Sequence, residues 1–144
     1  INMGGTTWEN HAIGYANGPT PFAGTYDGDG NEITGLTIDF TGDESSGFDS
    51  GNYAGLFGYL TGTVSNLGFT GNVTATGDFV GGLVGDLGTG AAAVTNSYAT
   101  GNVEGYRNVG GLIGGTNLSS ISSSYATGDT TGQERVGGLI GQLL

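Results

Sequence analysis

Val80-Gly81-Gly82-Leu83-Val84-Gly85 is a six-residue box that recurs along this 144-residue chain. Its other copies are Tyr53-Ala54-Gly55-Leu56-Phe57-Gly58, Val109-Gly110-Gly111-Leu112-Ile113-Gly114 and Val136-Gly137-Gly138-Leu139-Ile140-Gly141. The third residues of the four boxes stand 27, 29 and 27 residues apart. Self-similarity at a fixed period of this length is typical of repeat proteins, in which one small unit stacks on the next.

A second box lies between the copies of the first. Residues 64–73 correspond to residues 94–103 and to residues 121–130, and these segments are rich in β-branched and aromatic residues bounded by Gly, Asn, Asp or Ser. This is the pattern of short strands that end in tight turns, and no stretch shows a helical stripe with a period of 3.6 residues. Each repeat therefore contains at least two strands, and we expect almost no helix.

The repeats predict an all-β fold, a parallel β-solenoid of about five coils. A unit of about 27 residues cannot bury both faces of its strands alone, whereas stacking gives each strand parallel partners at a rise of roughly 4.8 Å per coil. Equivalent residues then form columns, and glycine lets backbones approach closely or adopt a positive φ. The residues predicted to carry the repeat are Gly55, Leu56, Gly82, Leu83, Gly111, Leu112, Gly138 and Leu139, with Val64, Val94 and Ile121 as a second column and Asn66, Asn96 and Ser123 as a polar ladder.

The chain is short enough for one continuous core, so we expect a single domain. In this interpretation residues 1–52 form the first coils, with an acidic loop near residues 39–52, and residues 53–144 form the repeats. The loop is serine-rich and carries Asp39, Asp43, Glu44 and Asp49. We interpret it as a solvated insertion, with weak cation binding or a contact role as alternatives.

The charge and composition exclude several classes of protein. Thirteen carboxylates face two arginines and no lysine, which gives a formal net charge of −11 at pH 7. Such a surface repels nucleic acid and anionic membranes, and it keeps a protein soluble in salty water. No apolar run approaches the roughly 18 residues of a membrane-spanning helix, so we expect no membrane insertion. The chain has no cysteine and a single histidine, His11, so it lacks the residues from which transition-metal sites and His-dependent catalytic triads are built.

The boxes resemble the GLUG motif, named for a Gly-Leu pair followed by a small hydrophobic residue and Gly, which recurs in large secreted bacterial surface proteins such as adhesins. The resemblance covers about residues 53–144, with residues 55–58 as a divergent first copy, and residues 1–38 resemble the coils that precede such repeats. It implies a β-helix-like fold, an extracellular or cell-surface location and an adhesive or stalk role. It brings no catalytic residues with it.

One segment has the composition of a calcium loop. Asp27, Asp29 and Asn31 alternate with glycines, as the oxygen ligands of Ca²⁺ loops do. The remaining spacing of an EF-hand is absent, because its acidic twelfth ligand would fall on Ile38. A turn between two strands is the competing interpretation, so weakly bound calcium is the one cofactor that we consider.

Two tyrosines are candidates for a ligand surface. Tyr98 and Tyr125 are equivalent in successive repeats and would stack as an aromatic pair able to hold a sugar ring, if their side chains face solvent; with the opposite strand parity they belong to the core. Arg107 is equivalent to Glu134 in the next repeat, which predicts an ion pair between neighbouring coils.

The leading functional hypothesis is a non-catalytic structural or adhesive module whose partners are other protein copies or cell-surface glycans. The alternative is a self-assembling extracellular filament, in which open solenoid ends stack head to tail, since the chain ends within a box and the strand that usually precedes Ile1 in the resembled proteins is missing. A processed piece of a longer polypeptide explains the same ends. A polysaccharide-active β-helix enzyme has the least support, because the carboxylates are dispersed.

Overall fold

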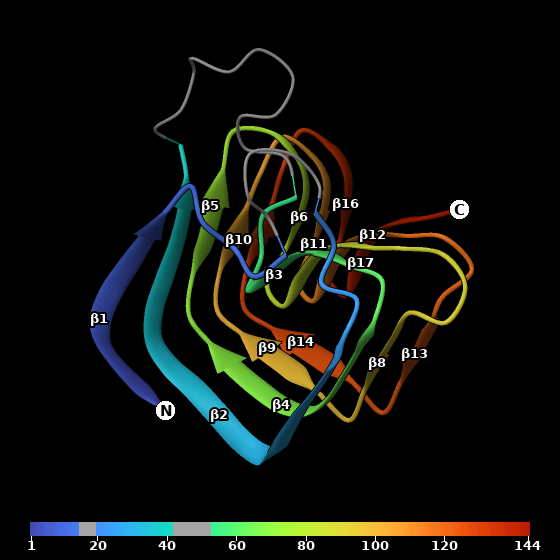
Figure 1. The fold of residues 1–144 in the computed structure, drawn as a ribbon. Coiled ribbons are helices and arrows are strands. Elements are labelled where there is room, and N and C mark those ends of the chain that lie inside the picture. The colour runs from blue at the N-terminus through green and yellow to red at the C-terminus, as the bar shows by residue number, and fades with distance from the viewer. Residues whose placement is uncertain (15–19, 42–52) are drawn as a thin grey trace.

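Strands and the turns between them make up the described structure. It is a computed structural model that describes residues 1–14, 20–41 and 53–144. Within these residues it contains seventeen strands and no helix, and every strand pair is parallel. Figure 1 shows the chain winding in successive coils around a common core. The expected parallel β-solenoid is confirmed.

Three parallel sheets form the walls of the solenoid. The largest contains β1 (Asn2–Glu9), β2 (Thr25–Phe40), β4 (Thr63–Thr70), β5 (Val73–Ala75), β8 (Ala93–Thr95), β9 (Tyr98–Thr100), β10 (Val103–Glu104), β13 (Ser120–Ser122), β14 (Tyr125–Thr127) and β15 (Thr130–Thr131). The second contains β6 (Asp78–Gly81), β11 (Arg107–Gly110) and β16 (Glu134–Gly137). The third contains β3 (Phe57–Leu60), β7 (Val84–Leu87), β12 (Ile113–Thr116) and β17 (Ile140–Leu143).

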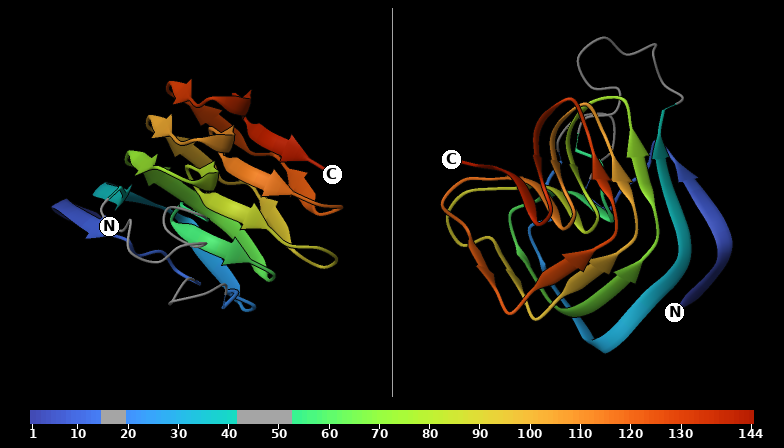
Figure 2. Two further views of the ribbon diagram at one scale, coloured as in Figure 1. Left: turned by 90° about the horizontal axis from the view of Figure 1, so that it is seen from above. Right: turned by 180° about the vertical axis from the view of Figure 1, so that it is seen from behind.

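The solenoid has about four turns, so the expectation of about five was slightly too high. The sheet β17-β12-β7-β3 contains four stacked strands, and the views in Figure 2 show the coils stepping from the N-terminal to the C-terminal end. The first part of the chain explains the difference. β1 pairs with β2, but Ile13 and Phe22 reach the next coil only through single bridges to Phe57 and Leu60, so the described part of this segment does not complete a coil.

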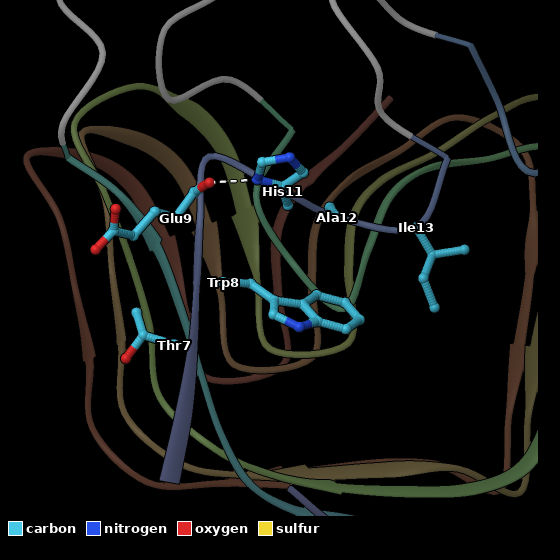
Figure 3. Close-up of a pocket in the computed structure, with 6 residues that line it drawn as sticks. All are labelled: Thr7, Trp8, Glu9, His11, Ala12 and Ile13. Atoms are coloured by element: carbon cyan, nitrogen blue, oxygen red, sulfur yellow. Dashed lines mark hydrogen bonds between the residues drawn. The ribbon is translucent and has the colours of Figure 1, made fainter.

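Trp8 covers the N-terminal end of the core. Its indole extends from β1 into the space that the first coil encloses (Figure 3), where it is partly buried and packs against the core. Within the described residues β1 pairs only with β2. A large aromatic side chain therefore provides here the apolar cover that a neighbouring coil provides elsewhere.

The register confirms the predicted columns. Val94 lies opposite Val64 in the coil before and opposite Ile121 in the coil after. Leu83 N donates to Leu112 O at 2.9 Å, and Leu112 N donates to Leu139 O at 3.0 Å. Equivalent residues of successive repeats are therefore hydrogen-bonded neighbours, although 27 to 30 residues separate them along the chain.

Each glycine box folds into a narrow hairpin that brings two of the sheets into direct contact. β6 and β7 lie in different sheets and are separated by only two residues. A Cβ atom placed on Gly81 would lie 2.7 Å from Gly114 N, and one placed on Gly110 would lie 2.7 Å from Gly141 N. Sheets with ordinary side chains pack roughly 10 Å apart. Because glycine has no side chain, glycines on both facing surfaces leave no layer of side chains between the sheets, and the two backbones are in contact.

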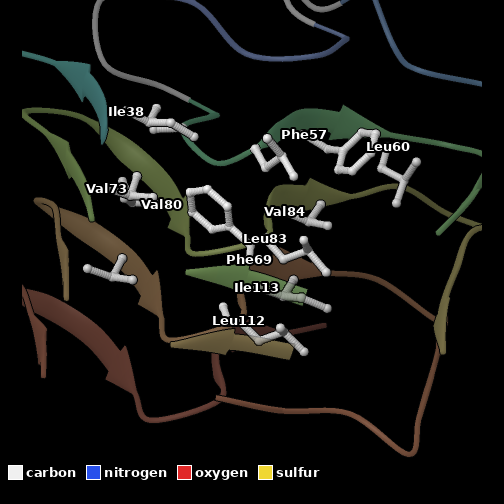
Figure 4. Packing of buried hydrophobic residues seen from close by; sticks show 14 of the residues in the cluster. Ile38, Phe57, Leu60, Phe69, Val73, Val80, Leu83, Val84, Leu112 and Ile113 are labelled. Atoms are coloured by element: carbon white, nitrogen blue, oxygen red, sulfur yellow. The ribbon is translucent and has the colours of Figure 1, made fainter. Parts of the chain in front are cut away.

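The tip of each hairpin inserts its leucine into the core (Figure 4). Leu83 and Leu112 are fully buried, and a Cβ atom on Gly82 would lie 2.5 Å from Gly111 O and 2.8 Å from the Cβ atom of Ala99 on the opposite wall. The tip therefore spans the interior and meets a small side chain on the far side. This explains why both a glycine and an alanine are needed at this level of the coil.

Two corners of the coil place residues other than glycine in the left-handed region. One column consists of Asn66, Asn96 and Ser123, with φ of 53°, 48° and 51°, and the other consists of Tyr53, Phe79, Asn108 and Arg135, with φ of 61°, 58°, 54° and 52°. This conformation costs roughly 1–2 kcal/mol for most residues and less for Asn. Because the corners recur in every coil, the stack imposes them even on Phe79 and Arg135.

Residues 39–52 were expected to form an acidic loop. Asp39 and Phe40 instead belong to β2, where Phe40 is buried in the core. Residues 42–52, including Asp43, Glu44 and Asp49, lie outside the described residues. The described part of the chain contains no helix long and apolar enough to cross a membrane.

We predict that Gly111→Ala destabilises the protein, whereas Gly138→Ala does not. A Cβ atom on Gly111 would overlap Gly138 O and lie 2.9 Å from the Cβ atom of Ala126, while nothing lies within 4 Å of the same atom on Gly138. The cost of overpacking at residue 111 should be about 1–3 kcal/mol, and the change at residue 138 should stay within about 0.5 kcal/mol. Urea unfolding followed by circular dichroism measures both, and equal losses at the two positions would contradict the packing described here.

Candidate functional site

An open groove runs across the coils on the outer face of the largest sheet. Its volume is about 250 Å³. One side is the left-handed corner formed by Asn66, Asn96 and Ser123, and the other is the column of Gly68, Tyr98 and Tyr125. The groove therefore collects equivalent positions from successive coils. It is the place where the predicted polar ladder and the predicted aromatic pair meet.

The structure resolves the strand parity of the tyrosines. Tyr98 and Tyr125 pair in register and face outward, while Ala99 and Ala126 face the core. The two rings are stacked, with centroids 5.1 Å apart and planes 8° apart. Tyr98 is half-buried and Tyr125 is 52% exposed. The stacked pair is thus as expected, and its ligand-binding role stays a prediction.

Glycine at residue 68 is what lets Tyr98 lie against the wall. Glu32, Gly68, Tyr98 and Tyr125 form one column across four strands. A Cβ atom on Gly68 would overlap the Cζ and Oη atoms of Tyr98. Desolvation raises the pKa of the Tyr98 phenol, and the charge of Glu32 and a hydrogen bond to it raise the pKa further. Sequence reasoning missed both residues: Glu32 lies outside the repeats, whereas Gly68 is equivalent to Tyr98 in the second box and could have been found from that correspondence.

Side-chain amides stack along the corner opposite the tyrosines. Asn96 Nδ2 donates to Asn66 Oδ1 at 2.6 Å, and Asn66 Nδ2 donates to Asp27 Oδ1 at 3.0 Å. The predicted ladder therefore exists between Asn66 and Asn96, and it continues to Asp27 in the preceding coil. In the neighbouring column serine hydroxyls bridge the coils, because Leu67 N donates to Ser97 Oγ and Ser97 N donates to Ser124 Oγ, both at 3.2 Å.

The candidate calcium ligands lie in a bulge of β2 at the same corner. The register between β2 and β4 shifts there, so that three residues of β2 stand opposite Asn66 alone. Asp27 Oδ1 accepts hydrogen bonds from Asp29 N and from Asn66, which lower the pKa of Asp27. Asn31 Nδ2 donates to Gly28 O at 2.9 Å. These bonds stabilise the turn without a cation, and calcium binding stays a prediction.

Arg107 forms its ion pair with the coil before it. Arg107 lies in register with Asp78 on one side and Glu134 on the other, as its equivalence to Glu134 required. Its guanidinium contacts Asp78 Oδ2 through Nη2 and through Nε, the latter at 3.0 Å. The prediction of a pair with Glu134 was therefore wrong about the partner. The planar guanidinium fork can approach one carboxylate through two nitrogens, and that carboxylate is Asp78.

Asp86 is a half-buried carboxylate that the sequence did not single out. It lies on β7 between Tyr59 and Gly115 in the neighbouring coils, and the ring of Phe79 occupies the space above Gly115. Tyr53 stacks on the other side of Phe79, with ring centroids 5.4 Å apart. Desolvation in this aromatic surrounding raises the pKa of Asp86 to about 6. The only sequence signal would have been its position directly after a box, which predicts a solvent-facing side chain.

A hollow larger than the groove lies at the N-terminal end of the described structure. It has a volume of about 570 Å³ and is lined by residues 7–9 and 11–13. Figure 3 shows Trp8 lying in it, with His11 at the rim and hydrogen-bonded to Glu9 O. His11 is exposed, as expected for a surface residue. Its lining residues bring no cluster of chemically reactive groups together.

The described residues contain no group of three or more His, Cys, Asp or Glu that could hold a metal ion. The groove instead gathers neutral amides, hydroxyls and aromatic rings. Such groups bind by hydrogen bonding and apolar contact and do not by themselves activate a nucleophile. The arrangement is therefore suited to recognition.

Comparison with known proteins supports the interpretation of the repeats. Residues 105–131 match the family model described as the GLUG motif. Over 97 residues, 66% of the chain, the sequence is 45% identical to halomucin of Haloquadratum walsbyi (strain DSM 16790 / HBSQ001). The aligned part makes up 1% of the length of that protein. No solved structure matches the chain. The resemblance to GLUG-repeat surface proteins is thereby confirmed.

We predict that Asp86→Asn stabilises the protein at pH 7 and not at pH 4. The folded pKa of Asp86, about 6, lies above the ordinary aspartate value of 3.8, so the folded state binds the proton more tightly than the unfolded state. The stability that this proton confers is complete below pH 4 and is lost as the pH rises through 6. The neutral amide avoids the loss, so its unfolding temperature at pH 7 should be roughly 2–6 °C higher.

Asp129→Asn is the matched control, because Asp129 is exposed and its equivalents in the two preceding coils are Asn102 and Asn72. It removes the same charge without relieving burial. Thermal unfolding at pH 4, 5, 6 and 7 distinguishes the two variants. A stabilisation of Asp86→Asn that does not change across this range would show that the burial of the carboxylate is not its cause.

Proposed function

We propose that the chain is a non-catalytic structural and adhesive module of an extracellular surface protein. The observation that carries the proposal is the uninterrupted parallel pairing from β2 through β4 and β8 to β13. Such a stack is a stiff element whose outer face repeats at a fixed spacing, which suits spacing and display. The GLUG motif and the similarity to halomucin support a surface protein.

The described carboxylates support the non-catalytic part of the proposal. A glycosidase needs two carboxyl groups that converge on one bond, roughly 5–9.5 Å apart. Here Asp27, Asp78 and Asp86 lie on three different sheets, and hydrogen bonds or an ion pair engage the first two. These three carboxylates therefore do not form the converging pair that the enzymatic alternative requires.

Antibody labelling of intact cells tests the location. An antibody raised against residues 53–144 is expected to label cells that produce the protein without permeabilisation, and external protease should remove the signal. A cytosolic marker protein is the control, because it should become labelled only after permeabilisation. Labelling that requires permeabilisation would contradict the proposal.

The acidic surface predicts that salt stabilises the fold. A net charge of −11 produces self-repulsion in the compact state, and the Debye length falls from about 10 Å at 0.1 M to about 3 Å at 1 M salt. The unfolding temperature should therefore rise by several degrees between these NaCl concentrations. Raising sucrose at constant low salt is the control for general solvent effects, and an unfolding temperature that is constant or falls with NaCl would contradict the argument.

Head-to-tail assembly is a second candidate function, favoured by the exposure of the last coil. Val136 is 44% exposed and Leu143 is 71% exposed, whereas Val109 and Thr116, their equivalents one coil earlier, are buried. A second copy that stacks on this face would bury them and continue the backbone pairing. The negative charge of each copy opposes this association at low salt.

Negative-stain electron microscopy and sedimentation at 0.1 M and 1 M NaCl test the assembly. Filaments are expected at high salt and high protein concentration, and Val136→Lys should abolish them because it places a charge on the stacking face. Particles that stay monomeric under all these conditions would contradict the filament hypothesis and leave the surface module unaffected.

A further inference from the structure

We propose that the groove between the asparagine column and the tyrosine pair binds a neutral polysaccharide chain laid along the solenoid axis. The asparagine column is Asn66 and Asn96, and the tyrosine pair is Tyr98 and Tyr125. The inference rests on the proposed adhesive function and specifies its ligand.

The asparagine column offers fixed hydrogen-bonding groups. Asn96 Nδ2 donates to Asn66 Oδ1 and Asn66 Nδ2 donates to Asp27 Oδ1, which sets the plane of each amide. An amide nitrogen carries two N–H donors, so each asparagine keeps one donor, and Asn96 keeps its carbonyl oxygen as an acceptor. Sugar hydroxyls both donate and accept. Groups that are already oriented lose little conformational entropy when they bind.

The tyrosine pair supplies the apolar surface that a sugar ring needs. Tyr98 lies over Gly68 and stacks with Tyr125, so neither ring must be ordered by the ligand. Tyr125 is the more exposed of the two, at 52%. Tyrosine combines a rigid apolar ring with a polar tip and loses little rotamer freedom on binding. A pyranose ring can therefore contact the tyrosines with its C–H face and the asparagines with its hydroxyls.

The charges around the groove favour a neutral ligand. None of the side chains that line it is ionised at pH 7, but Asp27 and Glu32 lie at its N-terminal end. Of the two arginines, Arg107 binds Asp78 and Arg135 contacts Asn108, so neither serves the groove. With a net charge of −11, polyanionic glycans are repelled before they reach the site.

The repetition of the groove favours a polymer. Three successive coils, at a spacing of roughly 4.8 Å, contribute Asn66 with Gly68, Asn96 with Tyr98, and Ser123 with Tyr125. Successive sugar units therefore meet related sets of polar and aromatic groups, with the amide and the ring together in the middle coil. The volume of about 250 Å³ is below the roughly 300–1,000 Å³ of pockets that enclose a whole small molecule. An open groove of this size holds part of a chain that continues in both directions.

NMR titration of the ¹⁵N- and ¹³C-labelled chain with cellohexaose, maltohexaose and chitohexaose tests the inference, with polygalacturonate as the anionic probe. At least one neutral oligosaccharide should shift the side-chain amide of Asn96 and the ring signals of Tyr125, with an affinity in the millimolar range or tighter. Tyr125→Ala and Asn96→Gly should each weaken binding by about fivefold or more. Glycine is chosen at residue 96 because it tolerates the left-handed φ of 48°.

Tyr106→Ala is the matched control, because Tyr106 is 41% exposed and lies outside the groove; it should bind as the unchanged protein does. Absence of shifts with all three neutral probes, shifts that map elsewhere, tighter binding of polygalacturonate, or equal affinity of all variants would each overturn the inference. Should Tyr125→Ala unfold, Asn96→Gly still decides. Surface labelling of cells is independent of these titrations. If the cells are labelled but none of the probes binds, the ligand proposed here is wrong and the proposed surface module is unaffected.

Discussion

Backbone hydrogen bonding between equivalent residues of successive coils is the interaction on which the rest of the structure depends. Every described strand pairs in parallel with a strand of a neighbouring coil. The hairpin tips between strands continue this bonding, from Leu83 to Leu112 and from Leu112 to Leu139. Such pairing satisfies the polar groups of one coil only if another coil follows in register. The stability of each repeat therefore depends mainly on its contacts with the adjacent repeats.

The glycine box allows so short a repeat to contribute to a hydrophobic core. The hairpin between β6 and β7 places glycines face to face, so two sheets touch without a layer of side chains, and the leucine at its tip fills the interior. Repetition has a cost at the corners, where Phe79 and Arg135 adopt positive φ. An isolated turn with these residues would choose another conformation, but the coils on either side hold this one.

The same repetition produces the outer surface. Any residue type that recurs at one position becomes a column, so two asparagines become a hydrogen-bonded ladder and two tyrosines become a stacked pair. A groove forms where two such columns run side by side. The acidic composition acts on this surface as a whole, since it opposes polyanions and association between copies at low salt. Recognition by this protein would thus arise from periodicity and charge.

The order of residues by itself determined the solenoid, because the period of the boxes is set by the length of one coil and the columns Leu56-Leu83-Leu112 and Val64-Val94-Ile121 follow from that period. It also determined the outline of the candidate site, since Asn66 with Asn96 and Tyr98 with Tyr125 are equivalent in the repeats. Only the tertiary structure decided what does not repeat. Whether the tyrosines face outward depends on strand parity, the proximity of Glu32 depends on the bulge in β2, and the partner of Arg107 depends on which way its side chain leans. The burial of Asp86 depends on aromatic rings from another sheet. Those contacts join residues that are not equivalent in the repeat, and a periodic sequence pattern predicts only which equivalent residues lie next to each other.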